Sequence, residues 1–302
     1  MRPYYKFSEY LKERFGCRVH KITVDAGFNC PNTDGTFSKD GCIFCDNCAF
    51  SPSVRGKNIP IERQIENGME RGRRRYKAKK FIVYFQPYSN TYAPAEILKE
   101  RYDAVRKFKD IAGISIGTRP DCIDAEKLAV IQAYAKEYEV WLEYGLQSIH
   151  NKTLKFINRN HTYEDFLKAV EITKNRGIKI CAHVILGLPG ETKENMFETA
   201  KECSRLGLDG IKIHPLHAVK GTALGKMLNE GKYIPLKLES YMEIVSEFLC
   251  RLNPEMVIQR LTADCPEEIL LAPEWINKKQ FILTKIEEKM LKERLTQGCL
   301  LK

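Results

Sequence analysis

Short apolar runs alternate with amphipathic stretches along most of this chain, and that alternation constrains the fold more than any other feature. Two parallel strands must be joined by a long crossover, usually a helix, so the pattern is typical of a parallel sheet covered by helices. Six such units are too few to close an eight-unit barrel. We therefore predict an α/β fold, a partial (β/α)6 barrel. The apolar runs are 20–24, 81–85, 113–116, 140–144, 178–186 and 210–213, and the helical stretches are 61–75, 95–109, 124–137, 163–175 and 191–206.

The rest of the chain, residues 232–302, is predicted to be mainly helical. Helical spacing covers 236–252 and 279–295, on either side of an irregular stretch. No repeat or low-complexity linker separates this part from residues 1–231, and a chain of 302 residues can bury a proper core. We therefore expect a C-terminal helical extension that caps the barrel formed by residues 1–231.

Charge and cysteine content narrow the functional classes. Lys and Arg number 49 against 39 Asp and Glu, so the formal charge is 49 − 39 = +10, which favours a polyanionic partner. No apolar run approaches the roughly 20 residues that span a bilayer, and the first residues are too polar for a signal peptide. We expect a cytoplasmic protein without a membrane partner. In a reducing cytosol, the odd number of 11 cysteines favours metal binding over disulfides.

Four of these cysteines, Cys30, Cys42, Cys45 and Cys48, lie within 19 residues in a loop predicted over 25–50. Three thiolates on one loop can hold three irons of a 4Fe-4S cluster and leave the fourth iron open. The alternative is a four-thiolate zinc site, which usually has two well separated Cys-x-x-Cys pairs. The spacings here are eleven, two and two residues, which fit that pattern poorly.

The cysteine loop, with Phe44 just before Cys45, resembles the cluster loop of radical S-adenosylmethionine (SAM) enzymes. Residues 141–148, WLEYGLQS, and 178–191, IKICAHVILGLPGE, resemble the fourth and fifth strands of that family. Several further stretches resemble its YhcC/YtqA-type branch, which is related to Elp3-like proteins, and the similarity extends over residues 5–289. These stretches are CPNTDGT, YFQPYSNTYAP, GTRPDC, INRNHTYEDF, HPLHAVKGT and LTADCPEE.

The resemblance implies a 4Fe-4S cluster on Cys30, Cys42 and Cys45, with Cys48 as a neighbour only. It also implies SAM as cofactor and a flavodoxin or ferredoxin as reductant. Ordinary structural roles are the alternatives: an ion pair at the strand end for Glu143 and an exposed helix charge for Arg159. The family usually binds the methionine amine with a Gly-Gly-Glu stretch at the end of the second strand, and Gln86 stands in that place here. The other implied SAM contacts are Glu143 and Gln147 for the sugar hydroxyls, Arg159 for the methionine carboxylate, and Gly187, Pro189 and Gly190 for adenine.

Four polar residues at predicted strand ends are candidates for the chemistry on the substrate. His214 and His217 follow the last apolar run, and Arg119 and Asp121 follow the third. Imidazoles and a guanidinium at one mouth could grip a substrate or relay protons. The alternative is that they are structural polar groups whose hydrogen bonds are satisfied at the strand ends. The role of Cys265, in a loop predicted over the mouth, stays open.

A basic run over residues 71–80 is the candidate contact to nucleic acid. So many cations on one helix suit phosphates better than paired carboxylates, although a solvated helix end is the alternative. The resemblance implies work on the wobble uridine of tRNA, from 5-carboxymethylaminomethyl to 5-aminomethyl, with no stable protein partner. Another RNA, a small molecule, or a non-catalytic zinc-dependent nucleic-acid-binding module are the alternatives. The cations of the run are Arg71, Arg73, Arg74, Arg75, Lys77, Lys79 and Lys80.

Overall fold

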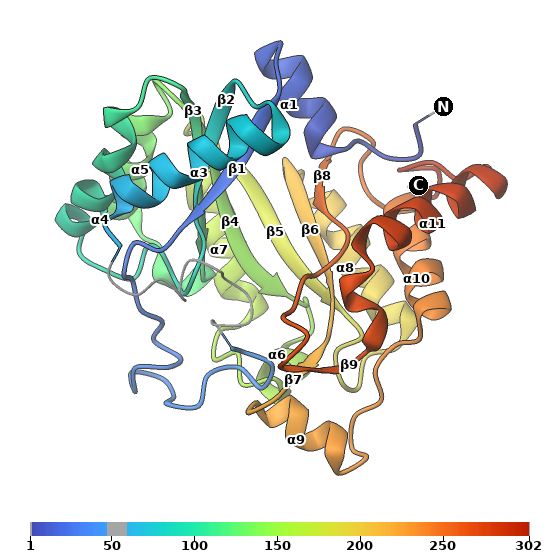
Figure 1. The fold of residues 1–302 in the computed structure, drawn as a ribbon. Coiled ribbons are helices and arrows are strands. Elements are labelled where there is room, and N and C mark those ends of the chain that lie inside the picture. The colour runs from blue at the N-terminus through green and yellow to red at the C-terminus, as the bar shows by residue number, and fades with distance from the viewer. Residues whose placement is uncertain (1, 47–58, 302) are drawn as a thin grey trace.

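A seven-stranded parallel sheet forms the centre of the computed structural model, which describes residues 2–46 and 59–301 (Figure 1). The sheet curls into an open half-barrel, as the alternation predicted. Its strand order follows the chain, so each crossover joins neighbouring strands. The strands are β1 (Val19–Val24), β2 (Lys80–Phe85), β3 (Ile111–Thr118), β4 (Glu139–Gln147), β5 (Lys179–Leu186), β6 (Gly210–Pro215) and β8 (Val257–Arg260).

Helices cover the outer face of this sheet. Two of them begin with a reciprocal capping box, in which Thr162 pairs with Asp165 and Thr192 with Asn195. The stretch predicted as one helix over 95–109 instead changes to a 3-10 helix after Tyr102. The crossover helices are α3 (Ile61–Tyr76), α4 (Ala95–Tyr102), α5 (Ala125–Tyr134), α7 (Tyr163–Thr173), α8 (Lys193–Arg205) and α10 (Leu238–Cys250).

The seventh strand, β8, comes from the C-terminal part of the chain, for which only helices were predicted. It pairs in parallel with β6, with Gly210 opposite Val257 and Lys212 opposite Arg260. Residues beyond 232 therefore build part of the barrel wall as well as a cap. The remaining elements are α1 (Phe7–Phe15), α6 (Asn151–Phe156), β7 (Ala218–Val219), α9 (Ala223–Asn229), β9 (Leu270–Ala272) and α11 (Lys279–Lys292). None of the helices in residues 2–46 and 59–301 has the length and apolar character needed to cross a membrane.

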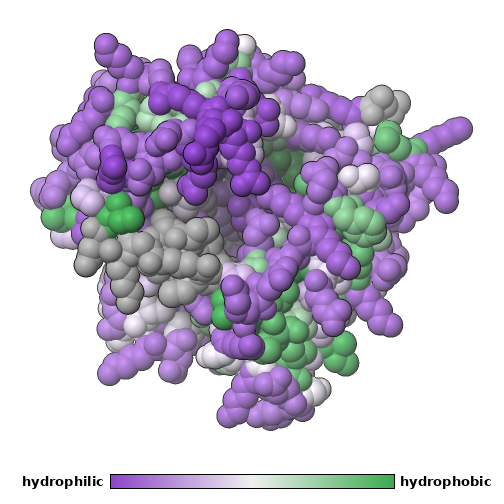
Figure 2. Space-filling view, viewed as in Figure 1, coloured by the Kyte–Doolittle hydropathy of each residue, from purple (hydrophilic) through white to green (hydrophobic). Residues whose placement is uncertain are grey.

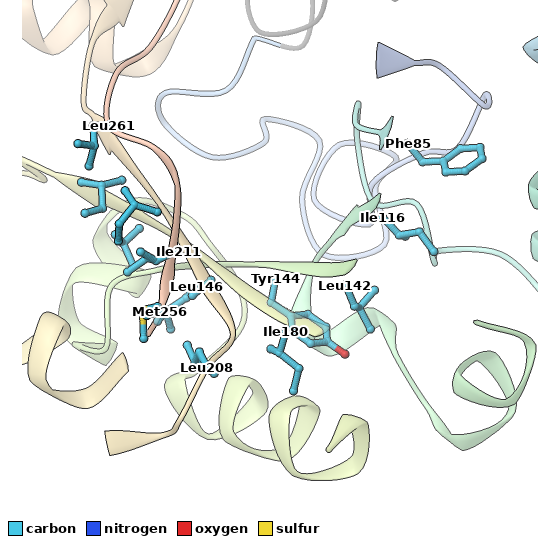
Figure 3. Close-up of a cluster of buried hydrophobic side chains, with 14 of the residues drawn as sticks. Phe85, Ile116, Leu142, Tyr144, Leu146, Ile180, Leu208, Ile211, Met256 and Leu261 are labelled. Atoms are coloured by element: carbon cyan, nitrogen blue, oxygen red, sulfur yellow. The ribbon is translucent and has the colours of Figure 1, made fainter. Parts of the chain in front are cut away.

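The main hydrophobic core lies between the sheet and the outer helices, where Figure 3 shows residues such as Phe85, Leu142 and Ile180. Side chains alternate between the two faces of a strand. On β4, Leu142 and Tyr144 join the core, whereas Glu143 and Gln147 face the interior of the half-barrel. The polar residues on this inner face define where chemistry can occur.

Candidate active site

A cavity of about 750 Å³ occupies the interior of the half-barrel at the carboxyl ends of its strands. Figure 2 shows the surrounding face as mostly hydrophilic, with a hollow near its centre. A cavity of this size can hold a cofactor and a small substrate group. Of the predicted site residues, it is lined by Cys30, Cys42, Cys45, Gln86, Arg119, Glu143, Gln147, Arg159, His214 and His217.

The three cysteines predicted as cluster ligands face this cavity together. Burial, followed by the nearby Cys42 and Cys30, raises the pKa of the Cys45 thiol well above its usual range, whereas Arg159 lowers it. Three thiolates this close repel one another, so a cationic group bound among them would relieve the repulsion. Cys48 lies outside the described residues.

The donor set fits a 4Fe-4S cluster better than a single metal ion. Within residues 2–46 and 59–301, no three His, Cys, Asp or Glu side chains gather closely enough to hold one ion. A zinc ion needs its sulfur ligands at about 2.3 Å from one point. Thiols that line one cavity without converging on a single ion suit a larger group, and Cys30, Cys42 and Cys45 are the residues that would hold it.

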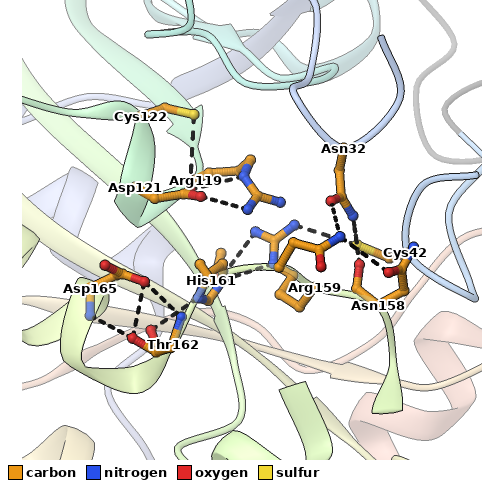
Figure 4. Close-up of polar contacts among 12 residues, drawn as sticks. Asn32, Cys42, Arg119, Asp121, Cys122, Asn158, Arg159, His161, Thr162 and Asp165 are labelled. Carbon is orange, nitrogen blue, oxygen red and sulfur yellow. Dashed lines mark hydrogen bonds and ion pairs between the residues drawn. The ribbon is translucent and has the colours of Figure 1, made fainter. Parts of the chain in front are cut away.

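Arg159 and Asn32 both point at the Cys42 thiol (Figure 4). Arg159 Nη1 lies 3.6 Å and Asn32 Nδ2 lies 3.5 Å from Cys42 Sγ. A guanidinium and an amide donor stabilise a thiolate, the form that binds iron. Arg159 is buried, so it is not an exposed helix charge. Arg159 also donates from Nη2 to the Gly145 carbonyl oxygen at 2.9 Å. Residue 145 must be glycine for this approach, because a Cβ there would come within 2.5 Å of the same nitrogen.

Two asparagines beside Arg159 anchor the cysteine loop, a role that the sequence reasoning missed. Asn158 Nδ2 donates to the Gly41 carbonyl oxygen at 2.6 Å, and Asn160 Nδ2 donates to Asn32 Oδ1 at 2.7 Å. Both asparagines have φ near +55°, the left-handed conformation that Asn tolerates better than most residues. The pair of asparagines around Arg159 was the available signal.

Arg119 faces the cavity, and Asp121 orients it from behind. The guanidinium makes a two-point ion pair with Asp121, at 2.9 and 2.7 Å. Its third nitrogen, Nη1, is buried and has no hydrogen-bond partner among the described residues. Arg119 is therefore held ready to donate to an anionic ligand, whereas Asp121 does not line the cavity.

Glu143 is engaged by the chain's own cations. Its Oε1 accepts from Lys21 Nζ at 2.7 Å, and its Oε2 accepts from His183 Nε2 at 2.8 Å and from Lys212. Burial alone would raise its pKa, but Lys21 and Lys212 hold the pKa well below its usual range. Glu143 therefore forms ion pairs, as its structural alternative predicted, but these ion pairs lie inside the barrel. Sugar binding by this residue would require displacement of these contacts.

The predicted histidines lie at the carboxyl end of β6, where His217 is buried and His214 is half-buried. Burial, followed by the charge of Arg260, lowers the pKa of His214 well below its usual range. Burial also lowers the pKa of His217, whose Nδ1–H donates to the Pro215 carbonyl oxygen at 3.3 Å. Both rings are neutral near pH 7, so they can donate or accept hydrogen bonds without adding charge.

The predicted adenine turn and the basic run lie away from the lining of the cavity. Gly187, Pro189 and Gly190 follow β5 but do not line the cavity. Gly187 has φ +85°, and a Cβ there would come within 2.9 Å of Leu236. The basic run spans the end of α3 and the amino end of β2, opposite the cysteine loop (Figure 1). All seven of its cations are exposed, and Figure 2 shows strongly hydrophilic surface over this part of α3.

A parallel half-barrel with three thiols around its inner cavity is the architecture of enzymes that use an iron–sulfur cluster to start radical chemistry. The Radical SAM superfamily model matches residues 35–203, and the Radical SAM C-terminal domain model matches residues 208–292. The chain therefore belongs to the radical SAM superfamily. Its cofactors are those of the superfamily, a 4Fe-4S cluster and SAM.

Relatives of known sequence support the YhcC-type branch. MJ0486 of Methanocaldococcus jannaschii is 42% identical over 97% of this chain and 91% of its own length. YhcC of Escherichia coli is 36% identical over 98% of this chain and 94% of its own length. The tRNA uridine(34) acetyltransferase of M. jannaschii is 32% identical over 52% of this chain but only 29% of its own length. Among solved structures, Elp3 of Methanocaldococcus infernus has the same fold, with a TM-score of 0.67, 21% identity, and coverage of 92% of this chain and 64% of that one.

Proposed function

We propose that this radical SAM enzyme acts on the wobble uridine of tRNA and converts a 5-carboxymethylaminomethyl group to 5-aminomethyl. The observation that carries the proposal is the 32% identity to a tRNA uridine(34) acetyltransferase across half of the chain. Further support comes from the cationic cavity and from the exposed basic run on α3. We also propose a cytoplasmic location and a flavodoxin or ferredoxin as the electron donor.

The cofactor supplies the reactive species, and the chain positions it. When bound, the 4Fe-4S cluster and SAM would supply a 5′-deoxyadenosyl radical, which can take a hydrogen atom from an unreactive carbon. Cys30, Cys42 and Cys45 would hold the cluster. Arg159 would hold the Cys42 sulfur in place, since its guanidinium lies 3.6 Å from that atom. Arg119 would donate its open Nη1 to an anionic group at the same wall.

The size of the cavity requires the substrate to enter as a single extruded nucleotide. About 750 Å³ does not admit a folded RNA beside the cofactor. Enzymes that modify a base inside a structured nucleic acid turn that base out of its stack. In this proposal the wobble uridine enters the half-barrel, and the rest of the tRNA stays on the outer surface, where exposed cations such as Arg74 and Arg75 can contact phosphates.

The substituent of the proposed substrate has a carbon that suits this chemistry. Its outer methylene lies between an amine and a carboxylate, and both groups stabilise a radical on that carbon. Transfer of one electron from this radical to an oxidised flavodoxin or ferredoxin, with loss of the amine proton, would give the imine. Addition of water would then release the two-carbon fragment as glyoxylate and leave the 5-aminomethyl group. The neutral imidazoles of His214 and His217 lie at the cavity wall and can exchange protons with water or amine there.

Mass spectrometry of tRNA nucleosides from a strain lacking the gene tests the proposal. We expect 5-carboxymethylaminomethyluridine to accumulate and the 5-aminomethyl-type uridine to disappear, with both restored by the wild-type gene. A wobble uridine pool unchanged by the deletion would contradict the proposal. It would favour radical chemistry on another RNA position or on a small molecule, for which the same fold would serve.

A further inference from the structure

The floor of the cavity holds more positive than negative charge. Glu143 is completely buried there and serves as the common partner of Lys21 and Lys212. Arg260, at the end of β8, lines the same cavity, and its side chain forms neither an ion pair nor a hydrogen bond within residues 2–46 and 59–301. Two lysines therefore share Glu143, and Asp264, the other carboxylate of the cavity lining, pairs with Lys279. Arg260 is left without a carboxylate, a balance that favours a second anion.

A count of N–H donors shows which of the two lysines can serve a ligand. An ammonium group has three N–H donors. Lys21 Nζ uses all three, on Glu143 at 2.7 Å and on Ser115 and Gln259 at 3.0 Å each. Lys212 Nζ donates to Glu143 and lies 4.1 Å from the centre of the Tyr84 ring. Lys212 therefore keeps a donor for the cavity, whereas Lys21 does not.

Lys212 and Arg260 lie side by side. They are register partners across the neighbouring parallel strands β6 and β8, and both line the cavity. Neighbouring strands are about 4.8 Å apart, so the ammonium and the guanidinium can reach the same ligand. A planar guanidinium fork beside a point charge matches an anion with two oxygens, such as a carboxylate.

We propose that Arg260 and Lys212 bind the carboxylate of the substrate. This inference rests on the proposed function and assigns to these two residues the carboxymethyl group of the modified uridine. The opposite wall already has its own cations, Arg119 and Arg159, beside the cysteines. One cavity would thus have a cationic end for the cofactor and a second cationic end for the substrate.

The electrostatics of Lys212 support this assignment. Burial lowers the pKa of Lys212 to about 7, and the charges of Lys21 and Arg260 act in the same direction against the opposing effect of Glu143. A carboxylate bound between Lys212 and Arg260 would offset the repulsion between these two groups. The bound substrate would therefore stabilise the charged form of Lys212.

Binding of two nucleosides to the cluster-loaded enzyme, measured by calorimetry, tests the proposal without turnover. The probes are 5-carboxymethylaminomethyluridine and its neutral carboxamide counterpart. We expect the wild-type enzyme to bind the carboxylate at least about tenfold more tightly, because a hydrogen bond to a charged group is lost in the amide.

Arg260→Gln should abolish the preference. This variant leaves the partners of Glu143 in place, so it avoids an unpaired buried charge. Arg205→Gln, on the outer surface of α8, is the matched control and should keep the preference.

Equal affinity of the wild-type enzyme for the two probes, or an undiminished preference in Arg260→Gln, would overturn the proposal. Such a result would leave the proposed function intact if tRNA from the deletion strain still accumulated the carboxymethylaminomethyl nucleoside. A clear preference that Arg260→Gln abolishes, together with unchanged tRNA in the deletion strain, would instead support the carboxylate site and reject the tRNA substrate.

Discussion

The Arg159 guanidinium donates to both the Cys42 thiol, at 3.6 Å, and the Gly145 carbonyl oxygen, at 2.9 Å. One side chain therefore ties the cysteine loop to the carboxyl end of β4. The guanidinium that contacts a predicted cluster ligand therefore also fixes the position of the loop. Changes at Gly145 should consequently affect metal binding, although that residue contributes no ligand.

Gly145→Ala should displace Arg159 and weaken the cluster. The new Cβ would lie 2.5 Å from Arg159 Nη2 and 2.8 Å from Gln147 Nε2. We expect a loss of roughly 1–3 kcal/mol in the free energy of unfolding and a reduced iron content. Gly207→Ala is the control, because its Cβ would meet open space and only its φ of +63° carries a cost. Iron content that falls equally in both variants would show that the contact with Arg159 is unimportant.

Asn158→Gly should loosen the cysteine loop while leaving the left-handed backbone accessible. Asn158 Nδ2 donates to the Gly41 carbonyl oxygen and to Ser38 Oγ, and both bonds would be lost. We expect a lower melting temperature, from a loss of about 1–2 kcal/mol, and faster release of iron to a chelator. Asn151→Gly, which removes side-chain bonds on α6 away from the cysteines, should lower the melting temperature without faster iron release.

Serine substitution of Cys30, Cys42 or Cys45 should abolish cluster assembly. Anaerobic reconstitution of the wild-type chain should yield about four irons and a brown protein, whereas each variant should lose most of its iron. Cys48→Ala should keep the wild-type iron content, because three thiolates suffice. A colourless wild-type protein with one bound zinc would contradict the cluster and favour a non-catalytic zinc module.

The lowered pKa of Lys212 predicts a rise in stability with pH. Its pKa falls from 10.5 to about 7 in the folded protein, so between these values the unfolded chain holds a proton that the folded chain has released. The free energy of unfolding therefore increases with pH in that window. Urea unfolding of the wild type and Lys212→Met should show a difference that grows in favour of the wild type from about pH 7 to about pH 10. A difference that stays constant across this range would argue against the lowered pKa.

The exposed cations of α3 should affect affinity for tRNA and leave the cluster intact. Replacing Arg74 and Arg75 by Glu should weaken tRNA binding severalfold and reduce its salt dependence, because fewer counterions are released. Iron content should stay at the wild-type value, since these residues lie at the opposite end of the strands from the cysteines. Charge reversal at Lys292 and Arg294, at the carboxyl end of α11, tests whether net charge alone produces the effect.

Periodicity predicted the sheet well because each of its first six strands is an apolar run followed by an amphipathic crossover. It missed β8, which has only four residues, VIQR, and lies in a stretch without a clear period. A short strand at a sheet edge is determined by its partner, here β6, more than by its own sequence. The error affected function as well, because Arg260 belongs to this strand.

The candidate site was predictable where spacing carried the signal and less so where partners decide the role. Three cysteines on one loop indicated their shared position at the cavity. The contacts of Glu143 could not be predicted, because Lys21 and Lys212 are more than 60 residues away on either side and meet it only inside the barrel. The same holds for Asn158 and Asn160, whose acceptors lie on the distant cysteine loop.

The seventh strand gives the C-terminal part of the chain two separable tasks. By pairing with β6, β8 protects a sheet edge that would otherwise be open to other chains. By ending in Arg260, it also supplies one wall of the cavity. Removing the tail would combine a folding defect with a change in ligand preference. Single substitutions at the end of β8 should instead redirect the enzyme among substrates of different charge, with the radical-generating half of the cavity unchanged.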